Sequence, residues 1–346
     1  MGLIAMMLFL MVAPSCNLHI FDYEGDCEVT HSIRFVYDMN LKWADAFPSE
    51  VKSVNLYVFD SDGVFLKEYM AAGEELSRPD FRIQLDLAPK KTYRFLAWCG
   101  LENENAGYES FKVVQPVAGI TSIEEIFCLL ESQGTTENGE EISDRRLLFL
   151  YHGYLEKYLE DNNDGTHYDY TINLTKDTNH IRVMLQQTTG SLSAEDFEFS
   201  LTAQNGNLSW DNQPAGDTKI EYRPWNIETD ILGVGNSGGE IMEYYGVLAD
   251  LNSSRLMASK VNDIYLTVRK KDTGKLLFKV PIIQYSLTEK SYYEKAYGYD
   301  MTDQEFLDRQ DEYTMTFFLD ENLQWIYAVI EILQWRVVIH NYENQN

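Results

Sequence analysis

The chain has 346 residues, of which 55 are acidic and 28 basic, and its formal net charge at pH 7 is −27. A charge this negative repels phosphate backbones, which excludes nucleic-acid binding, and it argues against adhesion to anionic lipids through basic patches. Single cores stop growing at about 250–300 residues, so the length favours two domains. The many Tyr, Val, Ile and Phe residues favour strands over helices.

The chain begins with a predicted signal, residues 1–15, and a predicted tether, residues 16–28. Residues 1–12 are apolar and uncharged, and small residues then lead to Cys16. A membrane span needs about 20 apolar residues, and a shorter apolar stretch at this position is typical of a secretory signal. Because bacterial lipoproteins are cut and acylated at such a cysteine, we expect lipid on Cys16, followed by an acidic tether. In the alternative, an ordinary secreted protein is cut nearby and Cys16 is incidental.

Residues 29–160 are predicted to form an N-terminal β-sandwich domain. Apolar and polar residues alternate from Val29 onward, and Asp62-Gly63 between two apolar runs predicts a hairpin. One helix is predicted over residues 122–131, with Thr121 as N-cap and Glu124 completing a capping box. The predicted strands are 29–37, 51–60, 64–66, 81–87, 92–98 and 146–153.

The polar, turn-rich residues 159–166 predict a domain boundary, after which residues 166–346 form a second domain of the same kind. A short helix is expected over residues 302–311, and the glycine-rich residues 233–239 are expected to be a surface loop. Strands spaced by about 8–12 residues are typical of sandwiches. The fold class is therefore all-β, with two tandem antiparallel β-sandwich domains and a few short helices. The strands predicted here are 168–174, 180–185, 197–203, a hairpin over 264–280, 313–319 and 330–340.

Four cysteines are present, and a lipid on Cys16 leaves three, enough for one disulfide and one free thiol. Cys27 and Cys99 are candidates for that disulfide, but the sequence leaves the pairing open. The six histidines are scattered, and the sequence has neither a nucleophile elbow nor a phosphate-binding loop. We therefore predict that the chain is not an enzyme and uses no metal or other cofactor, and that His152 is structural.

Several segments, taken in order, resemble the fimbrial anchor lipoproteins of the FimB/Mfa type, which belong to the type V pilus system. The most specific segments are residues 33–40 (IRFVYDMN), 45–47 (DAF) and 54–63 (VNLYVFDSDG). The turn before residues 93–98 (YRFLAW) and the closing residues 334–339 (QWRVVI) are similar as well. The resemblance implies two transthyretin-like sandwich domains and a lipoprotein exposed at the surface of the outer membrane. It also implies a role at the base of a fimbria, where the protein fixes the polymer and limits its length.

The resemblance further implies that subunits join by donor-strand exchange, and that in stalk subunits a protease with Arg or Lys specificity first removes the N-terminal strand. A chain tethered at Cys16 cannot lose its first strand, and no Lys or Arg occurs between Cys16 and Arg34. We therefore expect residues 330–340 to form the junction with the fimbrial stalk subunits by β-augmentation. In the alternative, this strand only completes the sheet of its own domain. The residues predicted on one face of the junction strand are Trp335, Val337 and Ile339.

Two other functions stay open at this point. Exposed aromatic residues bind sugars or partner proteins, so the chain could be a surface lipoprotein that contacts glycans or a host surface. It could also be a tip or stalk fimbrillin, which predicts proteolytic loss of the first strand. The aromatic residues concerned are Tyr292, Tyr293, Tyr297 and Tyr299.

Overall fold

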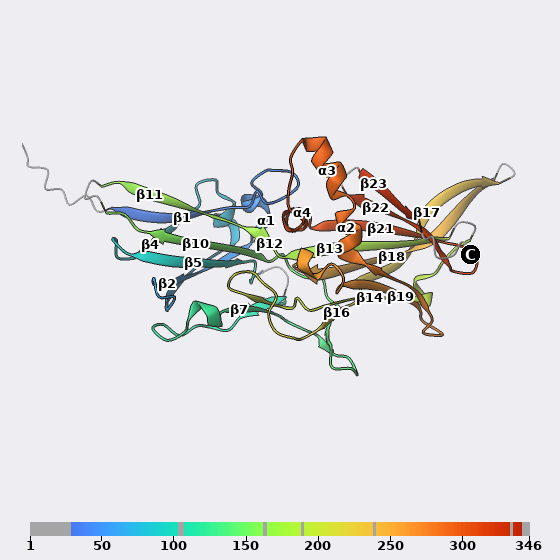
Figure 1. The fold of residues 1–346 in the computed structure, drawn as a ribbon, viewed down its shortest axis with the longest axis horizontal. Coiled ribbons are helices and arrows are strands. Elements are labelled where there is room, and N and C mark those ends of the chain that lie inside the picture. Colours follow the sequence, from blue (N-terminus) through green and yellow to red (C-terminus); the bar gives the residue numbers. More distant parts are fainter. Residues whose placement is uncertain are drawn as a thin grey trace, which may run out of the picture.

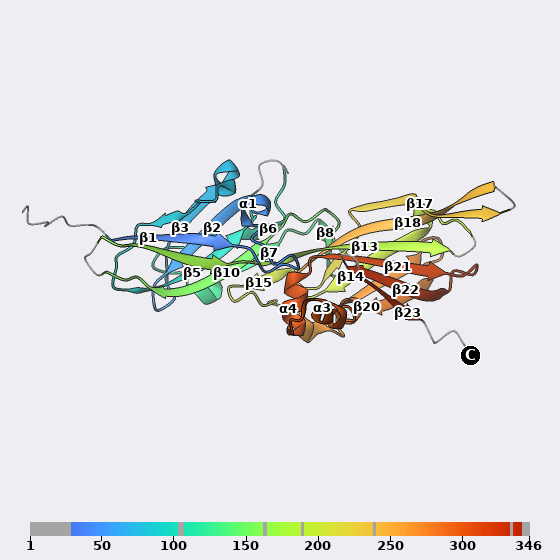
Figure 2. The ribbon, with the colours of Figure 1, turned by 90° about the horizontal axis from the view of Figure 1, so that it is seen from above.

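A computed structural model describes residues 29–102, 107–161, 165–187, 190–237, 240–332 and 335–340. The molecule is elongated, with two β-sandwiches lying end to end (Figures 1 and 2). The predicted all-β class with a few short helices is therefore confirmed. The predicted signal and tether, with Cys16 and Cys27, lie outside the described residues. Within the described ranges, no helix has the length and apolar character needed to cross a membrane.

The first sandwich consists of a three-stranded and a five-stranded sheet. Every residue of β2 is buried, because its alternate side chains enter two different cores. Val54 and Leu56 pack with the three-stranded sheet, whereas Tyr57 and Phe59 belong to a larger core that continues into the second sandwich. In sheet order, the strands are β11 (His167–Asn173), β1 (Thr30–Val36) and β4 (Ile83–Leu85), then β12 (Thr175–Lys176), β10 (Tyr151–Tyr158), β5 (Thr92–Cys99), β2 (Ser53–Phe59) and β3 (Phe65–Ala72).

The second sandwich is built from two six-stranded sheets. Strand β14 shows the alternation that its sequence predicts, with every second side chain buried. Most strand pairs are antiparallel, but β13 and β21 are parallel neighbours. One sheet contains β17 (Asn226–Ser237), β18 (Glu240–Ser254), β13 (Thr178–Gln187), β21 (Glu312–Leu319), β22 (Trp325–Ile332) and β23 (Trp335–His340). The other contains β20 (Leu276–Pro281), β19 (Tyr265–Lys270), β14 (Phe197–Ala203), β16 (Ile220–Tyr222), β9 (Glu141–Ser143) and β8 (Gly134–Thr135).

The two sandwiches exchange segments, so the predicted boundary at residues 159–166 needs correction. β11 and β12 follow that boundary but pair with β1 and β10 of the first sandwich, because Ile172 and Leu174 complete its core. In the opposite direction, β8 and β9 precede the boundary but extend a sheet of the second sandwich. A small sheet also joins the halves, and its strands are β15 (Asn207–Ser209), β7 (Phe127–Leu130) and β6 (Phe111–Val113).

Local structure differs from the prediction in several places. The strand expected over residues 146–153 begins only at Tyr151 and continues to Tyr158 as β10. The helix expected over residues 122–131 is only a 3-10 turn, Ile123–Glu125, followed by β7. Its capping box is formed by Ser122 and Glu125, one position later than predicted, and the alternating burial of residues 127–130 favours a strand. The glycine-rich segment expected as a loop lies largely in β17, and the single strand expected at residues 330–340 is the end of β22 plus β23.

Short helices connect the strands of both sandwiches. The helix predicted after Thr302 is confirmed, and the Thr302 side chain caps it by accepting a hydrogen bond from the Glu305 amide. Helices α2, α3 and α4 lie together beside the second sandwich (Figures 1 and 2). The α-helices are α1 (Phe47–Glu50), α2 (Ile282–Leu287), α3 (Lys290–Tyr297) and α4 (Asp303–Arg309), and the other 3-10 turns are Gly73–Ser77, Ala194–Asp196 and Ala258–Lys260.

Candidate functional site

Strand β1 is the first candidate site, because the fate of the first strand decides whether the chain stays tethered. β1 lies between β11 and β4 and pairs with both. Ile33 and Phe35 are buried in the core, whereas Arg34 is exposed on the other side of the strand. The prediction that Arg34 lies inside the first strand is therefore confirmed. A protease binds the residues around its cleavage site as an extended segment. It can therefore cut after Arg34 only when β1 has separated from β11 and β4.

Strand β23 is the second candidate site, and it forms one edge of its six-stranded sheet. Its partner among the described strands is β22, to which it pairs from Tyr327↔His340 to Ile332↔Trp335. Ile339 packs against the large core, whereas Val338 is 51% exposed. Trp335 and Val337 lie in the strand as predicted, opposite Ile332 and Ile330, but their side chains are outside the described residues. β23 thus completes its own sheet, and none of the strands in the described ranges pairs with its outer edge.

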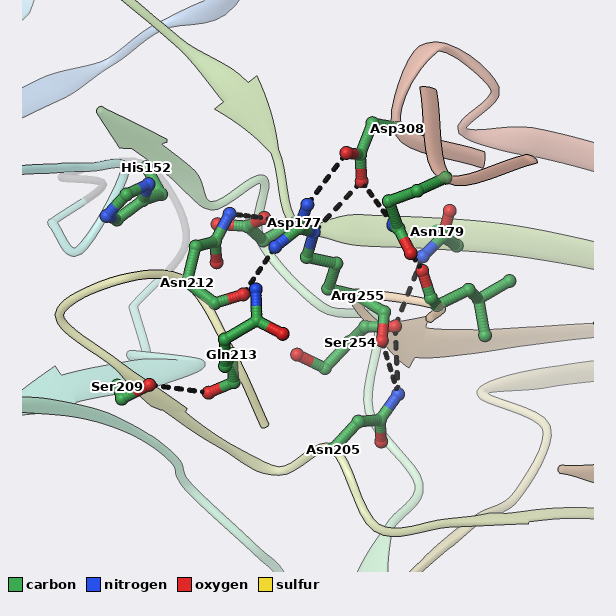
Figure 3. Close-up of polar contacts among 12 residues, drawn as sticks. His152, Asp177, Asn179, Asn205, Ser209, Asn212, Gln213, Ser254, Arg255 and Asp308 are labelled. Carbon is green, nitrogen blue, oxygen red and sulfur yellow. Dashed lines mark hydrogen bonds and ion pairs between the residues drawn. The ribbon is translucent and has the colours of Figure 1, made fainter. Parts of the chain in front are cut away.

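A polar network holds the linker between the sandwiches, which we define as Lys176 and Asp177, at the passage from β12 to β13 (Figure 3). The network consists of Asp177, Asn212, Arg255 and Asp308. The Arg255 guanidinium contacts both carboxylate oxygens of Asp308, at 2.7 Å from Nη2 and 2.9 Å from Nε. It also lies 3.8 Å from Asp177 and donates to the backbone carbonyl of Asn212. The Asn212 side-chain nitrogen in turn donates to Asp177 Oδ1 at 2.8 Å. The network therefore ties the linker residue Asp177 to α4 and to the loop after β15.

Asp177 is the member of this network whose pKa is raised by burial. It is fully buried, and this burial raises the pKa of its carboxyl to about 7. The charge of Arg255 and the hydrogen bond from Asn212 oppose that rise. Asp177 Oδ2 is buried and has no hydrogen-bond partner among the described residues, which also disfavours the ionised form. The linker thus contains a carboxyl group that titrates near neutral pH.

A second interdomain contact forms around Lys176, the last residue of β12. The Lys176 ammonium is buried and lies 3.2 Å from the Glu50 carboxylate and 2.5 Å from the Asp311 carboxylate. It also lies 3.5 Å from the centre of the Phe149 ring, a favourable cation–π distance. Glu50 belongs to the first sandwich and Asp311 to the second. The ion pairs of Lys176 and the contact between Arg255 and Asp177 therefore both hold the linker in place.

The tyrosines considered for glycan binding lie in and just after α3. Tyr293 is buried, whereas Tyr292, Tyr297 and Tyr299 are 46%, 55% and 41% exposed. The rings of Tyr293 and Tyr297 are tilted by 30° with their centres 4.4 Å apart, and the ring centres of Tyr299 and Trp43 are 4.8 Å apart. Trp43 comes from the first sandwich, and its indole nitrogen donates to the Tyr293 hydroxyl at 2.8 Å. We call Trp43, Tyr293, Tyr297 and Tyr299 the aromatic cluster.

The remaining predicted residues have structural surroundings. Cys99 and Cys128 are buried and form no disulfide with each other, and because Cys27 is outside the described residues its pairing with Cys99 stays a prediction. His152 is structural as predicted: its Nε2 lies 2.8 Å from the Trp210 carbonyl, and burial lowers the pKa of its imidazole to about 4. Across the described ranges, no three His, Cys, Asp or Glu side chains are grouped so that they could hold a metal ion.

Sequence reasoning missed Trp43, Asp177 and Arg255. Asp177 and Arg255 lie far apart in the chain, and an acidic residue carries little information in so acidic a sequence. Trp43 stands in an irregular segment without periodicity, so its pairing with α3 has no local signal. The fold and the candidate sites therefore define a protein of two tandem β-sandwiches, with β23 at the edge of one described sheet and partly exposed aromatic residues beside α3.

The chain belongs to the family of Fimbrillin-A associated anchor proteins Mfa1 and Mfa2, whose sequence profile matches residues 23–341. It is 22% identical to the minor fimbrium anchoring subunit Mfa2 of Porphyromonas gingivalis over 271 residues, which cover 78% of this chain and 75% of that protein. The family resemblance inferred from the sequence is therefore confirmed.

Two solved structures from Bacteroides thetaiotaomicron share the fold. A candidate adhesin is 33% identical with a TM-score of 0.76, and the match covers 89% of this chain and 97% of that one. A candidate polysaccharide-binding protein is 27% identical with a TM-score of 0.73, and the match covers 92% and 100% of the two chains. Both likenesses extend over the two sandwiches and not over one domain alone.

Proposed function

We propose that this chain is the lipid-anchored subunit at the base of a fimbria, fixing the polymer to the outer membrane and limiting its length. Membership of the anchor family and likeness to a minor fimbrium anchoring subunit support this role. The single observation that carries the proposal is the enclosure of β1 between β11 and β4. A lipid on Cys16 is connected to the first sandwich only through this strand, so a buried β1 transmits force from the polymer to the lipid.

The enclosed strand also argues against the role of a tip or stalk subunit. A stalk subunit is expected to lose its first strand to a protease and to offer the resulting groove to a neighbour. Here the loss of β1 would uncover Ile33, Phe35 and their partners in the core, and it would detach the chain from its lipid. The chain should therefore end a polymer and not propagate it.

The junction with the fimbrial stalk is proposed at β23. An edge strand presents unpaired backbone groups to which an extended segment of a partner can add. β23 is such an edge, and the half-exposed Val338 offers an apolar side chain to a neighbouring strand. Trp335, Val337 and Ile339 would supply register through their alternation, as proposed from the sequence.

Deletion of every residue after Gln334 tests the junction. We expect a truncated chain that is exported and lipidated but releases fimbriae into the medium, measured as the ratio of fimbrial protein in the medium to that on cells. Substitution of Val338 by Lys should release fimbriae too, because a charge on an edge strand opposes strand addition. Ile326→Lys on the inner strand β22, at a similarly half-exposed aliphatic residue, is the matched control. Normal retention by a folded truncated chain contradicts the proposal.

A second candidate function is carbohydrate binding. The observation that favours it is the exposure of Tyr297 and Tyr299 in one cluster with Trp43. The likeness to a candidate polysaccharide-binding protein agrees with it. An anchor with such a site would contact glycans of its own cell surface or of a host while it holds the fimbria.

A further inference from the structure

We propose that Trp43, Tyr297 and Tyr299 form a platform that binds neutral oligosaccharides of hexopyranose units. This inference rests on the carbohydrate-binding function proposed above and is independent of the anchor function. The three rings belong to the aromatic cluster, and each of them is at least 41% exposed. Side chains that only joined the two sandwiches would be expected to bury most of their surface.

The rings are brought together by the helical repeat of α3 and by one interdomain hydrogen bond. Residues four apart share a helix face, so Tyr297 lies above Tyr293, with ring centres 4.4 Å apart. The Tyr293 hydroxyl accepts from the Trp43 indole at 2.8 Å and donates to the Leu41 carbonyl at 2.7 Å. Tyr299 follows the left-handed Gly298 that ends α3 and meets Trp43 edge to face. Buried Tyr293 thus contacts both Tyr297 and Trp43, and Trp43 in turn contacts Tyr299.

The segment that presents Trp43 is held rigidly, as a binding platform requires. Trp43 has a φ of 53°, a left-handed conformation that costs about 1–2 kcal/mol for a residue other than glycine. The buried Asn40 side chain maintains it: its nitrogen donates to the Ala44 carbonyl at 2.7 Å, and its oxygen accepts from the Lys42 amide at 3.0 Å. A strained, well-supported backbone under a half-exposed ring is typical of a functional surface.

Arg309 and Glu305 hold the rings of Trp43 and Tyr299 in position. The Arg309 guanidinium is buried and lies 3.7 Å from the centre of the Trp43 ring, covering one of its faces. Glu305 accepts from Arg309 at 3.0 Å and from the Tyr299 hydroxyl at 3.1 Å. One carboxylate therefore sets the positions of both Tyr299 and the cation under Trp43. Trp43 is still 41% exposed, so part of this residue remains accessible to a ligand.

The chemistry of the surface favours a neutral sugar. Aromatic rings offer an apolar face with a negative quadrupole, and the C–H faces of a pyranose are apolar and weakly positive, so the two surfaces match. A polyanionic glycan would be repelled by a chain of net charge −27 and by Asp300, exposed next to Tyr299. The loop of Trp43 also forms part of the wall of a cavity of about 830 Å³, to which Asn40, Lys42 and Asp45 contribute polar groups.

Affinity electrophoresis of the folded chain through gels containing mannan, dextran, galactan or xylan tests the proposal, with polygalacturonate as the charged comparison. We expect at least one neutral polysaccharide to retard the chain, and Tyr297→Ala to weaken that retardation at least about fivefold. Tyr297 contacts Tyr293 but makes no hydrogen bond between the sandwiches among the contacts described, so this change spares the interdomain contacts. The matched control is Tyr292→Ala, because Tyr292 is similarly exposed on the same helix but outside the cluster. It should keep the wild-type retardation.

Three results would overturn the proposal: no retardation by any neutral polysaccharide, retardation by polygalacturonate alone, or equal weakening in the Tyr292 and Tyr297 variants. Thermal unfolding of both variants establishes that each is folded. Fimbrial retention measured on cells with Tyr297→Ala separates the two functions. We expect Tyr297→Ala to bind sugar weakly and still to retain fimbriae. A wild-type chain that retains fimbriae but binds no neutral polysaccharide contradicts only the carbohydrate site, whereas loss of retention in the β23 variants, with sugar binding intact, supports the two functions as separate.

Discussion

Substitution of Asp177 by Asn should change how the stability of this chain depends on pH. The folded-state pKa of Asp177 is about 7, whereas its ordinary value is 3.8. Since the folded-state pKa is the higher one, protonated Asp177 stabilises the folded chain at low pH. This contribution is complete below about pH 4 and is lost as the pH rises through about 7. Asn has nearly the same shape and cannot ionise, so the variant loses this dependence.

The magnitude follows from the distance between the two pKa values. About three pH units at about 1.4 kcal/mol each give about 4 kcal/mol. The free energy of unfolding of Asp177→Asn, relative to wild type, should therefore rise by up to about 4 kcal/mol between pH 4 and pH 8. Urea unfolding at five pH values across this range measures it, because other carboxylates titrate equally in both chains and cancel in the difference.

The control is Asp217→Asn, a change at an exposed aspartate in the loop before β16. This variant should differ from wild type by a small and constant amount at every pH. A constant difference for Asp177→Asn as well would refute the reasoning. It would mean that Arg255 and Asn212 keep Asp177 ionised throughout, so that the linker holds a permanent ion pair.

Three further predictions follow from the same structure. Arg255→Met leaves the buried Asp177 and the partly buried Asp308 without their cation and should lower the free energy of unfolding by about 3–5 kcal/mol, measured in urea at pH 8. Gly100→Ala should cost at least about 3 kcal/mol, because its φ is 90° and the new Cβ would lie 1.9 Å from the Phe149 carbonyl oxygen. Gly274→Ala, at a φ of 65° with open space around it, should cost only about 1–2 kcal/mol, and equal costs would contradict the steric argument. An Arg-specific protease should cut after Arg34 only when urea opens the first sandwich, as followed by mass spectrometry; rapid cutting of the folded chain would contradict the enclosure of β1.

Local patterns in the sequence predict much of this fold because alternation reports directly on burial. β14 has the predicted bounds, because every second side chain of this strand is buried, and β2 and β5 differ from theirs by only a residue or two at their ends, because their alternate side chains enter two different cores. Thr302 likewise predicts the start of α4, since its side chain caps an amide three residues away. Such signals come from neighbours in the chain and need no knowledge of the tertiary structure.

The arrangement of the strands could not be predicted in the same way. β11 looks like the first strand of a second domain, but it pairs in parallel with β1, and the choice depends on which core has room for Ile172 and Leu174. The segment of β8 and β9 crosses to the other sandwich for a similar reason. Among candidate sites, the C-terminal strand could be proposed from its pattern, whereas Trp43 and Arg255 acquire meaning only through partners distant in sequence.

The mass of the first peptide of the mature protein, isolated from outer membranes, tests the central claim most directly. The first lysine after Cys16 is Lys42, so a lysine-specific protease should release one peptide that spans the tether and all of β1. If the chain is a tethered anchor, this peptide begins at Cys16, has the added mass of lipid and is uncut after Arg34. A mature chain that begins at Phe35, or one that begins near Cys16 without lipid, would contradict the account.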